Sequence, residues 1–107
     1  MSLAAVYPAY LNKLKRKGRN ESELIKVICW LTGYTSKKLE IHLQKETTLR
    51  DFFTAAEINP LSAGITGSIC GVKISEIEDP LMKKIRYLDK LVDDLAKGKA
   101  IEKVLFQ

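Results

Sequence analysis

The chain has 107 residues, of which 46% are hydrophobic and 29% are charged, and its formal net charge is +5. A chain of this length forms one domain and buries about two thirds of the surface that its unfolded form exposes. The composition is close to the globular average, which excludes a disordered chain and a fibrous repeat. No uninterrupted apolar stretch is longer than residues 27–31, which is far shorter than the roughly 18 to 20 residues that a membrane-spanning helix needs.

The first residues lack the charged start and apolar stretch of a secretory signal. Residues 1–3, Met1-Ser2-Leu3, are interpreted as an artificial start of the chain rather than as part of the fold. Cys29 and Cys70 occur without CxxC or Cys/His spacing, so neither a disulfide framework nor a zinc site is predicted. We expect a cytoplasmic protein with reduced thiols and without a cofactor, a bound metal or a membrane association.

The positive charge is local. The first 19 residues contain no acidic side chain, and the 13 basic residues that follow are balanced by all 13 acidic ones. The whole excess therefore lies near the end of the first predicted helix, at Lys13, Lys15, Arg16, Lys17 and Arg19.

Glycine and proline divide the chain into helix-sized segments, because proline suits a first helical turn and glycine suits the residue after a helix end. These marks are Pro8, Gly18, Gly33, Pro60, Pro80 and Gly98. The first helix has an apolar face at i, i+3, i+4 and i+7 and ends at Gly18. That face consists of Tyr7, Tyr10, Leu11 and Leu14.

The second helix begins with a capping box at Asn20 and Glu23 and ends at Gly33. Its apolar stripe consists of Leu24, Val27, Ile28 and Leu31. A third, short helix starts at Thr35 and runs toward Lys45. A fourth starts at Thr48, and it ends near Asn59-Pro60 because the residue before proline resists helical geometry. The apolar face of the fourth helix contains Leu49, Phe52, Phe53 and Ala56.

Residues 61–74 contain three glycines and little charge, and they show no helical period. This irregular connection forms either a short hairpin or a loop tucked against the core, and periodicity does not decide between them. Ser75 and Glu78 have capping-box spacing and predict one turn before the Asp79-Pro80 helix start.

The longest helix follows Pro80 and carries an apolar stripe with heptad-like spacing. The stripe consists of Leu81, Ile85, Leu88, Val92 and Leu95. After Gly98 a short C-terminal helix carries Ile101, Val104 and Leu105. The prediction is one all-α domain over residues 1–107, a compact bundle of five to six short helices and one long helix. Helices two, four and the long one supply most of its core.

The basic residues of the first helix are a candidate contact for an anion or a nucleic acid. They also complement the helix dipole, and no recognition helix, stacking platform or RNA-binding signature accompanies them, so a solvated surface is the favoured interpretation. The second candidate is a functional turn around Gly67, Ser68, Cys70 and Gly71.

The functional turn does not have the spacing of a Walker loop or of a dinucleotide fingerprint. A thiol mechanism would pair Cys70 with His42, the single histidine, and with Glu40 or Asp79, but no sequence feature places these residues together. The favoured interpretation is a tight turn with Cys70 filling a small core site. No catalytic, cofactor-binding or metal-ligating residue is assigned, and an enzyme is the less favoured class.

Six stretches resemble a bacterial family without an assigned activity, the domain of unknown function DUF2200. They are Val6-Tyr7-Pro8, Ile28–Tyr34 (ICWLTGY), Asp51-Phe52-Phe53, Ile69–Val72 (ICGV), Ile77–Met82 (IEDPLM) and Ile85–Leu91 (IRYLDKL). The resemblance extends from about residue 5 to residue 105. It implies a stand-alone bacterial protein, and no functional residues come with it.

The leading hypothesis is a noncatalytic interaction domain whose long helix binds a second copy of the chain or another protein. The alternatives are weak nucleic-acid or anion binding through the basic residues, and a small enzyme that uses the turn around Cys70.

Overall fold

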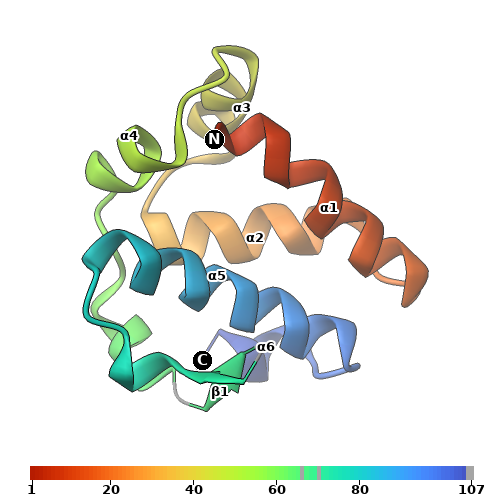
Figure 1. The fold of residues 1–107 in the computed structure, drawn as a ribbon. Coiled ribbons are helices and arrows are strands. Elements are labelled where there is room, and N and C mark those ends of the chain that lie inside the picture. Colours follow the sequence, from red (N-terminus) through yellow and green to blue (C-terminus); the bar gives the residue numbers. More distant parts are fainter. Residues whose placement is uncertain (66, 70, 106–107) are drawn as a thin grey trace.

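A computed structural model describes residues 1–65, 67–69 and 71–105 of the chain. In these ranges helices dominate, which confirms the predicted all-α class (Figure 1). The α-helices are α1 (Leu3–Arg16), α2 (Glu21–Thr32), α3 (Ser36–Gln44), α4 (Leu49–Thr54), α5 (Pro80–Ala96) and α6 (Ile101–Val104). Between α4 and α5 lie a 3₁₀ turn (Pro60–Gly64), strands β1 (Ser68–Ile69) and β2 (Val72–Lys73), and a second 3₁₀ turn (Ile74–Glu76).

Side-chain caps start four of the helices where the sequence predicts them. The side chain of Asn20 accepts a hydrogen bond from the backbone of Glu23, and Thr35 and Thr48 cap α3 and α4 in the same way. Asp79 accepts from the backbone N–H groups of Leu81 and Met82 at the start of α5. Each cap satisfies backbone donors that have no partner inside their own helix.

The start of α1 corrects two predictions. Leu3 is fully buried, Ser2 caps the helix, and Leu3 N–H donates to Thr47 O at 2.8 Å. The Met1 carbonyl accepts from Leu49 N–H at 2.9 Å. Residues 1–3 are therefore part of the fold, because their backbone bonds to the segment before α4. Pro8 does not open the helix but lies inside it.

Helices α2 and α5 cross the centre of the molecule, with α1, α3 and α4 on one side and α6 with β1 on the other (Figure 1). Most buried hydrophobic residues come from α2, α4 and α5, as predicted. Their side chains are Leu24, Val27, Ile28, Leu31, Leu49, Phe52, Phe53, Tyr87, Leu88, Leu91, Val92, Leu95 and Ala96.

The buried face of α5 differs from the predicted stripe. Leu88, Val92 and Leu95 are buried, but Leu81 and Ile85 in the first two turns are only partly buried. Tyr87 and Leu91 are buried as well, because α5 packs against several elements, α1, α2, α4, α6 and β1. The core thus covers the second half of α5 more completely than the first.

Residues 61–74 contain the hairpin that the sequence left open as one of two alternatives. Strands β1 and β2 pair antiparallel, with Ser68 opposite Lys73 and Ile69 opposite Val72. Ile65 and Ile74 at either side of the hairpin are buried. Ser75 is not a cap, since the turn Ile74–Glu76 begins after Lys73 without a side-chain cap. Among the described residues no helix has the length and apolar character needed to cross a membrane.

Candidate functional site

The basic residues of α1 divide into paired and exposed side chains. Lys13 Nζ donates to Asp93 on α5 at 3.1 Å. Arg19 donates to Glu23 at 2.7 Å and to the carbonyl of Lys99 at 2.9 Å. The remaining three side chains, Lys15, Arg16 and Lys17, are exposed, and they make no ion pair to the described residues.

The end of α1 lies beside the end of α5 because the two helices run in the same direction (Figure 1). Asp93 accepts from Lys13 and also from Lys97, whose Nζ is 3.0 Å away. Burial alone would raise the pKa of Asp93, but the hydrogen bonds from Lys97 and Lys13 outweigh it and hold the pKa below its ordinary value. Together these cations form what we term the basic end: Lys13, Lys15, Arg16, Lys17, Arg19, Lys97 and Lys99.

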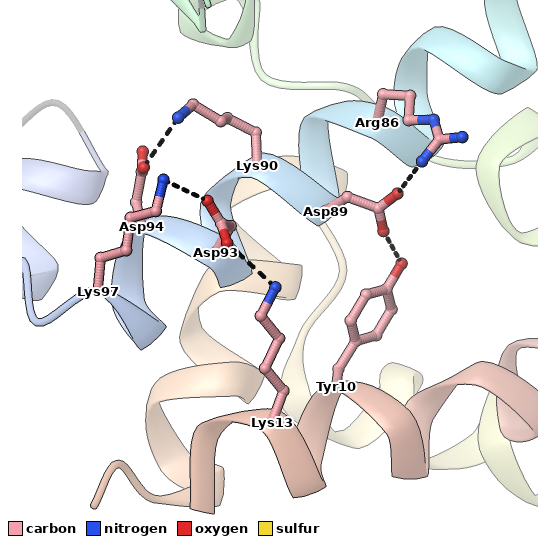
Figure 2. A network of polar contacts seen from close by, with 8 residues as sticks. All are labelled: Tyr10, Lys13, Arg86, Asp89, Lys90, Asp93, Asp94 and Lys97. Carbon is pink, nitrogen blue, oxygen red and sulfur yellow. Dashed lines mark hydrogen bonds and ion pairs between the residues drawn. The ribbon is translucent and has the colours of Figure 1, made fainter. Parts of the chain in front are cut away.

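A second polar group joins α1 to α5 one turn earlier (Figure 2). The Tyr10 hydroxyl donates to Asp89, and Asp89 also accepts from Arg86 at 3.2 Å. Burial, the hydrogen bond to Asp89 and the charge of that carboxylate raise the pKa of Tyr10 above its ordinary value. The phenol therefore stays neutral and acts as a structural donor, so it is unsuited to act as a base near neutral pH.

The hairpin covers a small hollow next to this polar group. Ile69 of β1 lines a cavity of about 220 Å³ with Ala9, Tyr10, Lys13, Asp89 and Val92. A side chain at Gly67 would touch Lys90, which itself donates to Asp94 at 3.1 Å. The polar atoms around the hollow are thus paired with one another. Of the predicted functional turn, Gly67, Ser68 and Gly71 lie on this hairpin, and Cys70 lies outside the described residues.

His42 lies in a different part of the molecule from the hairpin. Its ring contacts Tyr34 and Phe52, with centroids 4.9 Å and 5.4 Å away, and its Nδ1 lies 2.9 Å from the Thr47 hydroxyl. Helix α3 and strand β1 stand at opposite ends of the view in Figure 1. His42 therefore serves an aromatic cluster, and the described residues give the thiol mechanism no support.

Asp79 and Glu40, the two acids that the thiol mechanism would pair with His42, make other contacts in the structure. Asp79 caps α5, and Glu40 lines an open cavity of about 380 Å³ between α2 and α3 together with Tyr7 and Glu21. The Tyr7 hydroxyl donates to Glu21 at 2.7 Å. Burial, and to a smaller extent this hydrogen bond, raises the pKa of Tyr7 above its ordinary value.

Cys29 lines a cavity of about 480 Å³ that opens between α2 and α6. Burial raises the pKa of the Cys29 thiol, which keeps it protonated and weakly nucleophilic. The other lining residues are Lys26, Trp30, Ile101, Glu102 and Leu105, and His42 is not among them. In the part of the chain that the structure describes, no three His, Cys, Asp or Glu side chains gather to hold a metal ion.

An apolar groove lies at the other end of α5, and the sequence reasoning missed it. It measures about 430 Å³ and lies where the N-terminus, α4 and the first half of α5 meet. Its lining residues are Met1, Thr48, Leu49, Arg50, Leu81 and Ile85. Met82, next to Leu81, is 42% exposed. The apolar stripe on α5 is the sequence feature that points to this groove. Which residues of the stripe are exposed depends on how the core packs, and the sequence alone does not show this.

Fold and surface define a small all-α domain with a basic end and an apolar groove. The chain belongs to the family described as an uncharacterized protein conserved in bacteria (DUF2200), which it matches over residues 1–106. This confirms the resemblance seen in the sequence, and the match includes residues 1–3.

Among solved structures, the chain is similar to the crystal structure of the uncharacterized protein SP1917. The two are 48% identical with a TM-score of 0.93, and the match covers 99% of this chain and 88% of that one. No match was found among curated proteins.

Proposed function

We propose that the protein is a noncatalytic helical interaction domain that pairs with a second copy of itself through the apolar groove. The observation that carries this proposal is the first half of the α5 stripe. Leu81 and Ile85 continue the apolar spacing of Leu88, Val92 and Leu95, yet the chain's own core leaves them partly exposed. An amphipathic helix whose apolar face extends beyond its own core is available to a partner.

The composition of the groove supports a protein occupant. Methionine and arginine are enriched at protein interfaces, and Met1, Met82 and Arg50 lie in or beside the groove. Arg50 and Asp51 are both exposed and adjacent on α4. In a two-fold contact each surface meets a copy of itself, so a rim with both charges allows opposite charges to pair.

The oligomeric state tests this proposal directly. We expect the mass from light scattering to rise toward twice the monomer mass as the concentration increases from about 10 to 200 µM, since a weak dimer forms by mass action. The mass should change little with salt, because the contact is mainly apolar. Leu81→Gln combined with Ile85→Gln should give the monomer mass over the same range.

The control carries the same chemical change elsewhere. Ile41→Gln combined with Leu61→Gln alters two exposed apolar residues that do not line the groove, and it should leave the dimer intact. Since Leu81 and Ile85 are partly buried, thermal melting must show that the groove variant folds, and Arg50→Glu on the exposed rim offers a second, milder probe. A monomer at every concentration, or equal dissociation of both double variants, would refute the proposal.

A further inference from the structure

A second surface, remote from the groove, brings cations from separate parts of the sequence together. Because α1 and α5 are parallel, the basic end lies where both helices finish, whereas the groove lies where α5 starts (Figure 1). Lys97 and Lys99 follow α5 and join the five basic residues of α1 and its following turn. The links are the shared carboxylate of Asp93 and the bond from Arg19 to the Lys99 carbonyl.

The basic end retains free positive charge after its internal contacts are counted. The carboxylates that contact its cations are Glu23, Asp93 and Asp94. Lys15, Arg16 and Lys17 remain exposed, and Lys97 is exposed although it pairs with Asp93. Lys13, Arg16 and Lys17 have the i, i+3, i+4 spacing of one helix face, so their charges act together. Both helices also end here, which explains part of the basic character through their dipoles.

The chemistry of this surface favours one class of partner. Protein interfaces depend on a few buried apolar or aromatic anchors, and the basic end contains none. A membrane-surface helix needs an apolar face, and the exposed large hydrophobic residues of the described chain, Met1, Ile41, Leu61 and Met82, are not among its residues. Tyr10, which lines the hollow beside Lys13, is partly buried and bonded to Asp89, so it does not offer an open face on which single-stranded bases could stack. Nucleic-acid duplexes, by contrast, are held mainly through their phosphates.

We propose that the basic end, formed by the exposed lysines and Arg16 at the end of α1 together with Lys97 and Lys99, binds the phosphate backbone of double-stranded nucleic acid without sequence preference. Asp93 acts as an internal counter-anion. It neutralises Lys13 and Lys97 in the free protein, and duplex phosphates compete with it for these two cations.

The test is fluorescence anisotropy of a labelled DNA duplex of about 20 base pairs titrated with the full chain at about 50, 100 and 200 mM salt. Log affinity should fall linearly with log salt. Lys15→Gln/Arg16→Gln/Lys17→Gln should weaken binding about tenfold or more at the lowest salt and flatten the salt slope by about two to three. Asp93→Asn should strengthen binding severalfold, because it frees Lys13 and Lys97.

The matched control is Lys37→Gln/Lys38→Gln/Lys45→Gln. It removes three exposed positive charges from α3 and its C-terminal cap, so the net charge changes equally. This variant should keep nearly the parental affinity and slope. Circular dichroism and thermal melting should show that both triple variants fold, which is expected because all six side chains are exposed.

Four results would overturn the proposal. The first is an affinity that does not depend on salt, and the second is an equal loss of affinity in both triple variants. The third is competition by a polyglutamate peptide of matched charge that is as strong as competition by unlabelled duplex. The fourth is binding to anionic phosphatidylserine vesicles at affinities where the duplex does not bind. The third result would identify an acidic protein as the partner, and the fourth a membrane surface.

Discussion

At the scale of single residues, several described polar side chains are satisfied by neighbours from distant parts of the chain. Tyr10 and Lys13 on α1 reach Asp89 and Asp93 on α5, which lie 79 and 80 positions later (Figure 2). Lys13, which the sequence analysis names as a candidate anion contact, thus also links α1 to α5. An exposed ion pair contributes little to stability, but a half-buried phenol bound to a carboxylate contributes more.

Tyr10→Phe should lower the free energy of unfolding by about 1 to 2 kcal/mol near neutral pH, because Asp89 loses a half-buried donor. Urea unfolding measures this loss. Folding raises the pKa of Tyr10, so the neutral phenol contributes its full stabilisation when the pH is below 10.0, the ordinary pKa of tyrosine. This contribution is lost as the pH rises above that value. The parent protein should therefore lose stability more steeply above pH 10 than the variant. If the stability of both proteins fell equally with pH, the hydrogen bond from Tyr10 to Asp89 would not be the cause of the loss.

At the scale of elements, local sequence rules account for the helices well. The caps at Asn20, Thr35, Thr48 and Asp79 all form because each side chain needs only backbone N–H groups two or three residues away. The rules failed at Pro8, where α1 continues through the proline, and at Ser75. At the first of these, contacts outside the helix decided its start: Leu3 is buried, and its N–H pairs with Thr47.

The glycines after α1 and α2 provide a comparison at this scale. Gly18 and Gly33 both have φ of +74°, but a side chain at Gly18 would meet open space, whereas one at Gly33 would lie 3.0 Å from the Glu57 carbonyl oxygen. Gly18→Ala should cost about 1 kcal/mol from backbone strain alone, and Gly33→Ala about 2 to 3 kcal/mol because residue 57 must also move. Thermal or urea unfolding measures both. Equal losses would show that the segment at Glu57 gives way freely.

At the scale of the whole molecule, the two ends of α5 have different characters. The start of α5 borders the apolar groove, and its end carries lysines that join those of α1. If the protein pairs through the groove, the two basic ends remain outside the contact. A dimer would then carry two phosphate-binding surfaces, and it gains affinity through effective concentration only where one duplex reaches both of them.

The first three residues also act at this scale, because they join α1 to the segment before α4. Leu3→Ala should destabilise the protein by about 2 to 5 kcal/mol, as expected for a leucine removed from a packed core. Leu61→Ala, at a residue that is 56% exposed, should change stability by less than about 0.5 kcal/mol. Chemical denaturation compares the two variants. A small loss for Leu3→Ala would mean that this end of α1 is dispensable for the fold.

The sequence by itself determined the helical class, most helix boundaries and the helices that supply the core. These features depend on periodicity and on caps, which act over at most one or two turns of chain. It also located the positive charge near the end of α1. Only the tertiary structure decided the hairpin in residues 61–74, the place of residues 1–3, the exposure of Leu81 and Ile85, and the meeting of the basic α1 residues with Lys97 and Lys99. Those features depend on which distant segments pack together, because burial and charge pairing are properties of a surface that many segments share.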